Sequence, residues 1–238
     1  MRSFRSYLTA FILLILGAFA VIRGIEWLRA HPQHNMFAPF NLADPQGWAT
    51  SDKLQYLVGD DAACFAAFDR AEAGYERLPP VGEGPCRAKQ RMTLTGNALV
   101  PSLAPAGAGP GCAVTAGLAL WTRDAVQPLA RQYFGQKVVR MENMGSYNCR
   151  PIAGRDVLSE HSTANAIDIS AFILADGTRI SLLRDWSDAG AKGQFLRRVR
   201  DGACTLFSTT LSPDYNQAHA DHFHLDMAER SGGWTVCR

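Results

Sequence analysis

The first thirty residues join a basic start to an uncharged apolar run. Arg2 and Arg5 precede Leu8–Ile22, fifteen residues without a charge. A signal-peptide core has about this length, whereas a membrane-spanning helix needs about twenty apolar residues, which the run reaches if it continues to Trp27. Residues 18–20 (AFA) have the small-residue pattern of a cleavage site. We expect a retained membrane helix rather than a cleaved signal, and either one exports the rest of the chain.

Export accounts for the six cysteines, because disulfides persist in oxidising compartments. They are scattered, and the absence of a Cys-x-x-Cys pair argues against a zinc ribbon or thioredoxin-like chemistry. The even count predicts three structural disulfides. Proximity in the sequence suggests the pairs Cys64–Cys86, Cys112–Cys149 and Cys204–Cys237.

The charge balance and composition exclude several classes of protein. Lys and Arg number 24 and Asp and Glu 22, so a net charge of +2 gives no reason to expect a nucleic-acid partner. An aromatic content of 10% and the lack of a long polar tract argue against global disorder. The 238 residues permit one sizeable domain with appendages. We therefore expect a membrane anchor or signal segment at 1–29, a linker at 30–51 and a domain at 52–238.

Hydrophobic periodicity predicts a mixture of helices and short strands. Helices are expected at 52–76, at 115–134 with a kink at Pro128, and at 185–199. Strands are expected at 92–100, 136–143, 166–174, 203–208 and 222–227, with a loop at 101–111. Because the strands lack regular βαβ spacing, we expect an α+β fold with a mostly antiparallel sheet and flanking helices.

Three histidines gather near the C-terminus as His219-x-x-His222-x-His224. On a strand, His222 and His224 point to one face, while Phe223 and Leu225 point to the other. Clustered imidazoles lose water and repel one another when protonated, and a divalent metal removes this penalty by binding the neutral rings. The pattern therefore predicts a metal site.

A second group lies in the middle of the chain, where His161 precedes Asp168 by seven residues. Ile167 and Ile169 are expected to face the core, which turns Asp168 outward. His161, Asp168 and one histidine of the C-terminal cluster would supply three protein ligands. Three ligands plus a water are typical of catalytic zinc, although two histidines and a carboxylate also suit Fe(II). Export and disulfides favour Zn2+.

The motif Ser159-x-His161-x6-Asp168, followed by His222-x-His224, resembles the zinc peptidase superfamily of lysostaphin-type enzymes, D-alanyl-D-alanine peptidases and the Hedgehog domain. The additional His219 is similar to the arrangement in penicillin-insensitive murein endopeptidases. Three wider stretches together resemble the bacterial extensin-like C-terminal domain family. They are GSYNCR at 145–150, LSEHSTANAIDI at 158–169 and AHADHFHLDM at 218–227, and the resemblance covers roughly residues 60–238.

This resemblance implies that His161, Asp168 and His224 hold the metal. It also implies that His222 acts as general base or transition-state donor, with His219 assisting. Arg150 would contact a carboxylate of the substrate.

The sequence departs from the pattern at two positions. Ala164 stands where many relatives have glycine. Asp221 stands where the dipeptidase branch has glutamate, and this favours a histidine-assisted mechanism.

The expected function is an exported zinc metallopeptidase, an endopeptidase or carboxypeptidase-like hydrolase, acting on stem peptides or cross-links of peptidoglycan. A catalytically inactive, zinc-bearing cell-wall or protein binding module is the main alternative. A disulfide-stapled envelope protein without metal is a weaker one. We expect a single-pass protein of the inner membrane with its domain in the periplasm, or a periplasmic protein after signal cleavage.

Overall fold

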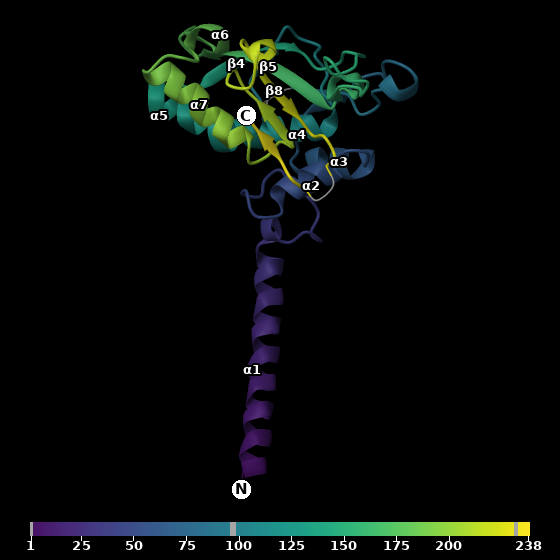
Figure 1. Cartoon of the computed structure of the whole chain (residues 1–238), viewed down its shortest axis with the longest axis vertical. Helices are drawn as coiled ribbons and strands as arrows, with labels where there is room; N and C mark the ends of the chain where they lie inside the picture. The colour runs from purple at the N-terminus through teal and green to yellow at the C-terminus, as the bar shows by residue number, and fades with distance from the viewer. Residues whose placement is uncertain (1, 96–98, 231–232) are drawn as a thin grey trace.

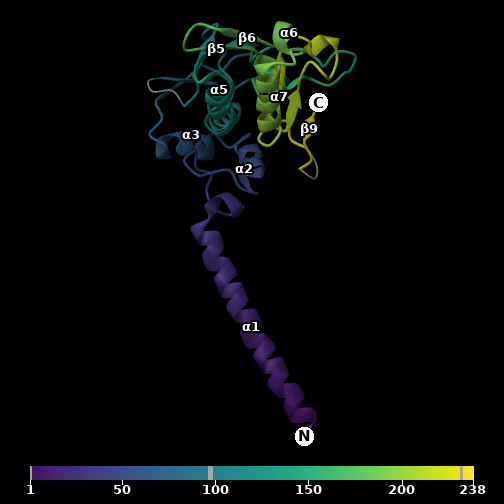
Figure 2. The ribbon, with the colours of Figure 1, turned by 90° about the vertical axis from the view of Figure 1, so that its left-hand side faces the viewer.

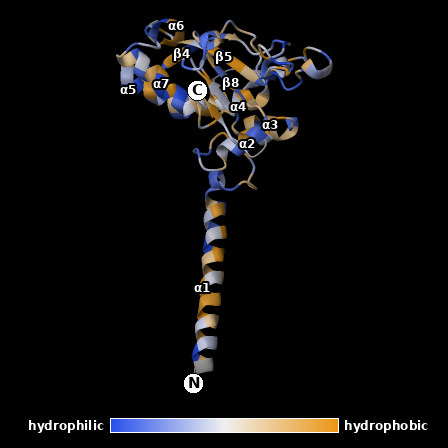
Figure 3. Cartoon of the chain, viewed as in Figure 1, coloured by the Kyte–Doolittle hydropathy of each residue, from blue (hydrophilic) through white to orange (hydrophobic). Residues whose placement is uncertain are grey.

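A long helix, α1 (Arg2–Ala30), projects from an α+β domain in the computed structural model of the chain (Figure 1). The structure describes residues 2–95, 99–230 and 233–238. Hydrophobic residues recur along α1 (Figure 3), and Phe4–Ala30 is long and apolar enough either to cross a membrane or to serve as a signal sequence. The expected N-terminal apolar helix is therefore confirmed, without distinguishing these two roles.

The segment between α1 and the domain packs onto the domain. It contains η1 (Pro32–His34), and its Phe40 and Leu42 are buried in the hydrophobic core. Two helices follow, α2 (Thr50–Tyr56) and α3 (Asp61–Arg70), and they lie between α1 and the sheet (Figure 2).

The single helix predicted at 52–76 is wrong, because the chain turns between α2 and α3. Gly59 adopts a left-handed conformation there, with φ of 85°. The carboxylate of Asp60 then caps α3 by accepting a hydrogen bond from Ala63 N at 2.9 Å.

Two short strands, β1 (Tyr75–Arg77) and β2 (Met92–Leu94), form a separate antiparallel pair, with η2 (Gly84–Cys86) between them. The strand predicted at 92–100 is shorter than expected, and its residues 96–98 lie outside the described part of the chain. β3 (Ser102–Ala104) lies inside the predicted loop and forms an edge of the main sheet.

The helix predicted at 115–134 is three consecutive segments: α4 (Cys112–Trp121), one π-helical turn η3 (Thr122–Val126) and α5 (Gln127–Phe134). Pro128 follows this π-helical turn. Because α4, η3 and α5 form one continuous helix, the missing N–H of Pro128 removes a helical hydrogen bond, and its ring crowds the carbonyl four residues earlier, in η3. The irregularity therefore lies where the predicted kink at Pro128 places it.

In the described part of the chain, six further strands belong to the main sheet: β4 (Val138–Gly145), β5 (Ala166–Leu174), β6 (Arg179–Ser181), β7 (Thr209–Leu211), β8 (Phe223–Asp226) and β9 (Val236–Cys237). The strand order is β3-β4-β5-β8-β7-β9, and β6 pairs with the C-terminal half of β5. The β3–β4 and β7–β9 pairs are parallel, so the sheet is mixed rather than mostly antiparallel. For β3 and β4 the reason is the helical crossover through α4 and α5, which returns the chain in the same direction.

Two helices follow β6, namely α6 (Leu182–Asp185) and α7 (Ala191–Ala203), where one helix at 185–199 was expected. The extended segment expected at 203–208 is wrong, because the chain turns after α7 and the strand begins at Thr209.

Helices α4 and α7 pack together on one face of the sheet. Trp121 lies at the centre of this layer, with its Nε1 donating to Val199 O at 2.7 Å. Its ring packs edge-on against Phe172 and Phe223 from the sheet. Helix α4 closely approaches the residue that follows β8 at Gly117, where a Cβ would lie only 2.5 Å from Met227 Cε.

All six cysteines form disulfides: Cys64–Cys112, Cys86–Cys149 and Cys204–Cys237. The third pair is as predicted, whereas the predicted Cys64–Cys86 and Cys112–Cys149 are wrong. Cys64 and Cys112 instead join helices α3 and α4, which pack against each other in the core.

Candidate metal centre

Strands β5 and β8 bring the two predicted groups together. In their antiparallel register Asp168 lies directly opposite His224, so both side chains project from the same face. The neighbouring pair Ile169 and Phe223 is fully buried on the other face. The alternation predicted for both strands is confirmed.

The third residue, His161, comes from a short 3-10 helix, η4 (Glu160–Thr163), immediately before β5. Ser159 caps this turn, with its Oγ accepting from His161 N at 3.3 Å. Ala164 ends it in the left-handed region, with φ of 57°. Glycine adopts this conformation without a Cβ penalty, which gives a physical reason for glycine at this position in related sequences.

The three atoms that could bind a metal, one from each residue, form a nearly equilateral triangle. His161 Nε2 lies 3.0 Å from His224 Nδ1 and 3.2 Å from Asp168 Oδ1, and His224 Nδ1 lies 3.0 Å from the same oxygen. Ligands bound tetrahedrally to zinc at 2.0–2.1 Å lie about 3.3 Å apart. Two nitrogens and one oxygen at these separations form a group that could hold a metal ion.

The ring nitrogens that point away from the triangle have hydrogen-bond acceptors. His161 Nδ1 donates to the carbonyl of Ser146 at 2.9 Å, and His224 Nε2 donates to Asp226 Oδ2 at 3.0 Å. In the neutral form that binds a metal, each ring keeps its proton on the outer nitrogen and directs a lone pair into the triangle. Partners of this kind fix the tautomer and orientation of metal-binding histidines. Without a metal, the inner nitrogens can instead carry the protons that are donated to Asp168.

The charges inside the triangle shift two pKa values strongly. Burial raises the pKa of Asp168, but hydrogen bonds from His161 and His224 outweigh it and hold the pKa well below its usual value. Burial lowers the pKa of His224, but hydrogen bonds to Asp168 and Asp226 raise it to about 9. At neutral pH Asp168 is therefore ionised, as a metal ligand must be, whereas His224 is protonated and would release its proton when a metal binds.

His222 lies beside the triangle with its two nitrogens in different roles. Nδ1 donates to Asp221 Oδ1 at 2.8 Å, and Nε2 faces Asp168 Oδ1 at 3.7 Å. The carboxylate of Asp221 therefore fixes the tautomer that leaves Nε2 free to accept a proton next to the three donor atoms.

His219 lies in η5 (Gln217–His219), with its ring centroid 5.1 Å from that of His222. Burial, followed by the proximity of His222 and His224, lowers its pKa to about 4. Its Nδ1 hydrogen-bonds to Asn216 Oδ1 at 2.8 Å, which leaves Nε2 of the neutral ring as an acceptor.

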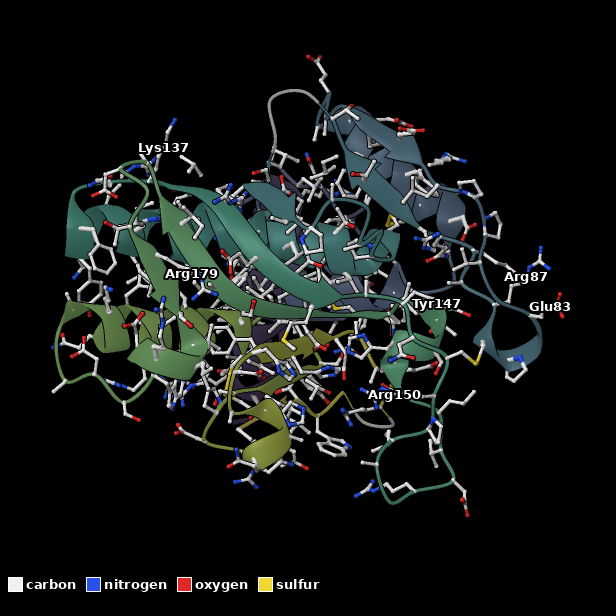
Figure 4. All side chains as sticks on the ribbon, turned by 90° about the horizontal axis from the view of Figure 1, so that it is seen from above. Glu83, Arg87, Lys137, Tyr147, Arg150 and Arg179 are labelled. Atoms are coloured by element: carbon white, nitrogen blue, oxygen red, sulfur yellow. A yellow bond between two sulfur atoms is a disulfide. The ribbon has the colours of Figure 1, made fainter. Side chains whose placement is uncertain are left out.

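Arg150 lies on the segment that follows β4 and is labelled in Figure 4. The neighbouring disulfide Cys86–Cys149 fixes this segment, and Ser162 Oγ hydrogen-bonds to both N and O of Arg150. Its guanidinium is exposed and contributes to the lowered pKa of His219. The hydrogen bonds with Ser162 hold the backbone of Arg150 against η4, the turn that carries His161.

Sequence reasoning missed the supporting residues Ser146 and Asp226. Asp226 is only 4% exposed, and the period of two in His222-x-His224-x-Asp226 places it on the same strand face as His224. That signal was present in the sequence. The carbonyl of Ser146 could not be found, because its contact with His161 depends on the path of the chain after β4.

The molecule is thus an α+β domain whose sheet carries a His-Asp-His group on the face opposite its helices. A family model described as extensin-like protein C-terminus matches residues 62–238, and the chain belongs to this family. Searches of curated proteins and of solved structures found no match.

Proposed function

We propose that this domain is an exported zinc metallopeptidase that hydrolyses stem peptides or cross-links of peptidoglycan. The observation that carries the proposal is the triangle of His161 Nε2, Asp168 Oδ1 and His224 Nδ1, with both outer ring nitrogens already hydrogen-bonded. Bound there, zinc would lower the pKa of a water molecule to about 7 and polarise the scissile carbonyl.

The chain's own residues supply the proton transfers. His222 Nε2 accepts a proton from the attacking water and returns it to the leaving amine, while Asp221 stabilises the imidazolium formed in between. Once protonated, His222 also donates a hydrogen bond to the developing oxyanion. His219 is less suited to donate to the oxyanion, because its Nδ1 proton is already hydrogen-bonded to Asn216. It assists instead as a hydrogen-bond acceptor, through Nε2 of its neutral ring.

Arg150 is suited to bind a substrate carboxylate, because a guanidinium pairs with a carboxylate through two parallel hydrogen bonds. Peptidoglycan stems carry free carboxylates, and an exported protein of a bacterial envelope meets them in abundance. The choice of substrate is supported by this chemistry, by the apolar N-terminal helix and by the resemblance to murein peptidases.

Digestion of purified murein tests the proposal. We expect the zinc-loaded protein to release peptide fragments, a chelator to abolish release, and His222→Ala to retain metal while losing turnover. A zinc-loaded protein that binds murein without cleaving it would identify the binding-module alternative. A metal content below about 0.1 equivalent after mild purification would refute the metal site itself.

A further inference from the structure

Aromatic side chains gather where α1 meets the domain. The Trp27 ring, in the last turns of α1, stacks on His31 at 4.5 Å and lies 5.7 Å from the ring of Trp48. Trp48 precedes α2, and its ring lies 4.5 Å from that of His34. We name Trp27, His31, His34 and Trp48 the junction cluster.

The junction cluster is tied to the domain by hydrogen bonds. His31 Nδ1 donates to Trp27 O at 2.8 Å, and Trp48 N donates to His34 Nδ1 at 3.1 Å. Lys53 of α2, only 5% exposed, donates to Pro32 O at 2.6 Å. The end of α1 is therefore held against the domain at several points rather than joined through a free tether.

The cluster nevertheless leaves large apolar area in contact with solvent. Trp48 is 78% exposed, and Phe37 in the adjoining turn is 98% exposed. Phe37 N is fixed by Asn35 Oδ1 at 3.0 Å, so this side chain stands on an ordered turn. Exposed aromatic rings on two ordered segments of the same junction are typical of a surface that contacts an apolar partner.

The dimensions of α1 identify the apolar partner. Tyr7 and Trp27 are twenty residues apart in one helix, which at 1.5 Å per residue is about 30 Å, the thickness of the hydrocarbon core of a bilayer. Tyrosine and tryptophan are enriched at the two membrane–water interfaces. A bilayer bounded by these two residues would place Trp48, in contact with Trp27, at the depth of the headgroups.

We propose that Trp48 and Phe37 insert into the headgroup region of the membrane that α1 crosses, so that the base of the domain docks on the bilayer surface. We assign lipid as the partner of this surface, because the surface is continuous with the apolar surface of α1. The inference concerns the anchor and is independent of the proposed peptidase activity.

Quenching by brominated lipids tests the docking. The full chain is reconstituted into phosphatidylcholine–phosphatidylglycerol vesicles with and without brominated acyl chains, and tryptophan emission is compared. We expect Trp48→Phe to remove about half of the quenched emission, because Trp27 and Trp48 are the tryptophans assigned to the interface. Trp186→Phe, at a residue only 8% exposed in the domain, should leave the quenched emission unchanged.

Two variants that each add a tryptophan test the docking without relying on a loss of signal, which misfolding could also cause. Phe37→Trp adds a fluorophore at a fully exposed position and should increase the quenched emission. Tyr215→Trp, 47% exposed beside His219, is the matched control and should add only unquenched emission. Equal quenching of Phe37→Trp and Tyr215→Trp, or unchanged quenching in Trp48→Phe, would overturn the proposal and favour a protein partner or a second copy.

Discussion

The two oxygens of Asp226 accept different hydrogen bonds, and this makes Asp226→Asn an incisive test of the metal centre. Oδ2 accepts from His224 Nε2 and Oδ1 accepts from Ala228 N, both at 3.0 Å. Asparagine has the same shape but one acceptor oxygen, so its NH2 must face one of these two donors. If the NH2 group faces the His224 ring, Nε2 of the ring must accept a hydrogen bond from it. The ring proton then moves to Nδ1, the atom that points at Asp168.

We expect Asp226→Asn to weaken zinc binding about 10- to 100-fold, which corresponds to about 1.4–2.8 kcal/mol. The assay is competition for zinc against a chelating dye, with the melting temperature of the metal-free protein measured in parallel to show that the fold persists. Asp201→Asn, on the exposed surface of α7, is the matched control and should bind zinc like the wild type. An Asp226→Asn protein that folds and binds zinc with unchanged affinity would show that this carboxylate does not orient His224.

Three further predictions address the metal, the disulfides and the core. His161→Ala should abolish stoichiometric zinc in metal analysis, and the opposite pattern, with zinc lost only in His222→Ala, would contradict the ligand assignment. Joint replacement of Cys86 and Cys149 by serine should lower the free energy of unfolding by about 4 kcal/mol, because the disulfide closes a loop of 63 residues; a denaturant midpoint equal to that of the wild type would contradict this. Gly117→Ala should destabilise the domain by about 1–3 kcal/mol, because its Cβ overlaps the side chains of Met227 and Phe207, and a gain in melting temperature would show that the core has room there.

The sequence predicted those parts of the fold that depend on local alternation. The strand at 166–174 has the expected bounds, because a polar Asp168 between two buried isoleucines leaves one orientation on the sheet. The same alternation brought Asp168 and His224 to one face. The predicted helix at 52–76 failed at Gly59 and Asp60, where a left-handed turn and a helix cap were both readable.

Long-range pairing was not predictable in the same way. Cys64 pairs with Cys112 rather than with the nearer Cys86, because α3 and α4 pack in the core, and nothing near either cysteine encodes that contact. The parallel pairing of β9 with β7 likewise depends on how the C-terminal segment returns to the sheet. The carbonyl of Ser146 belongs to the same class, since a backbone acceptor carries no residue-type signal.

The fixed junction between α1 and the domain limits where the domain can work. A protein on a long free linker samples a volume, whereas one held at its anchor moves mainly by lateral diffusion and samples an area. Since a domain of this size has a diameter of about 40 Å, a membrane-anchored form would reach only the layer of the envelope nearest the bilayer. Newly exported polymer would pass through that layer before it joins the mature network farther out.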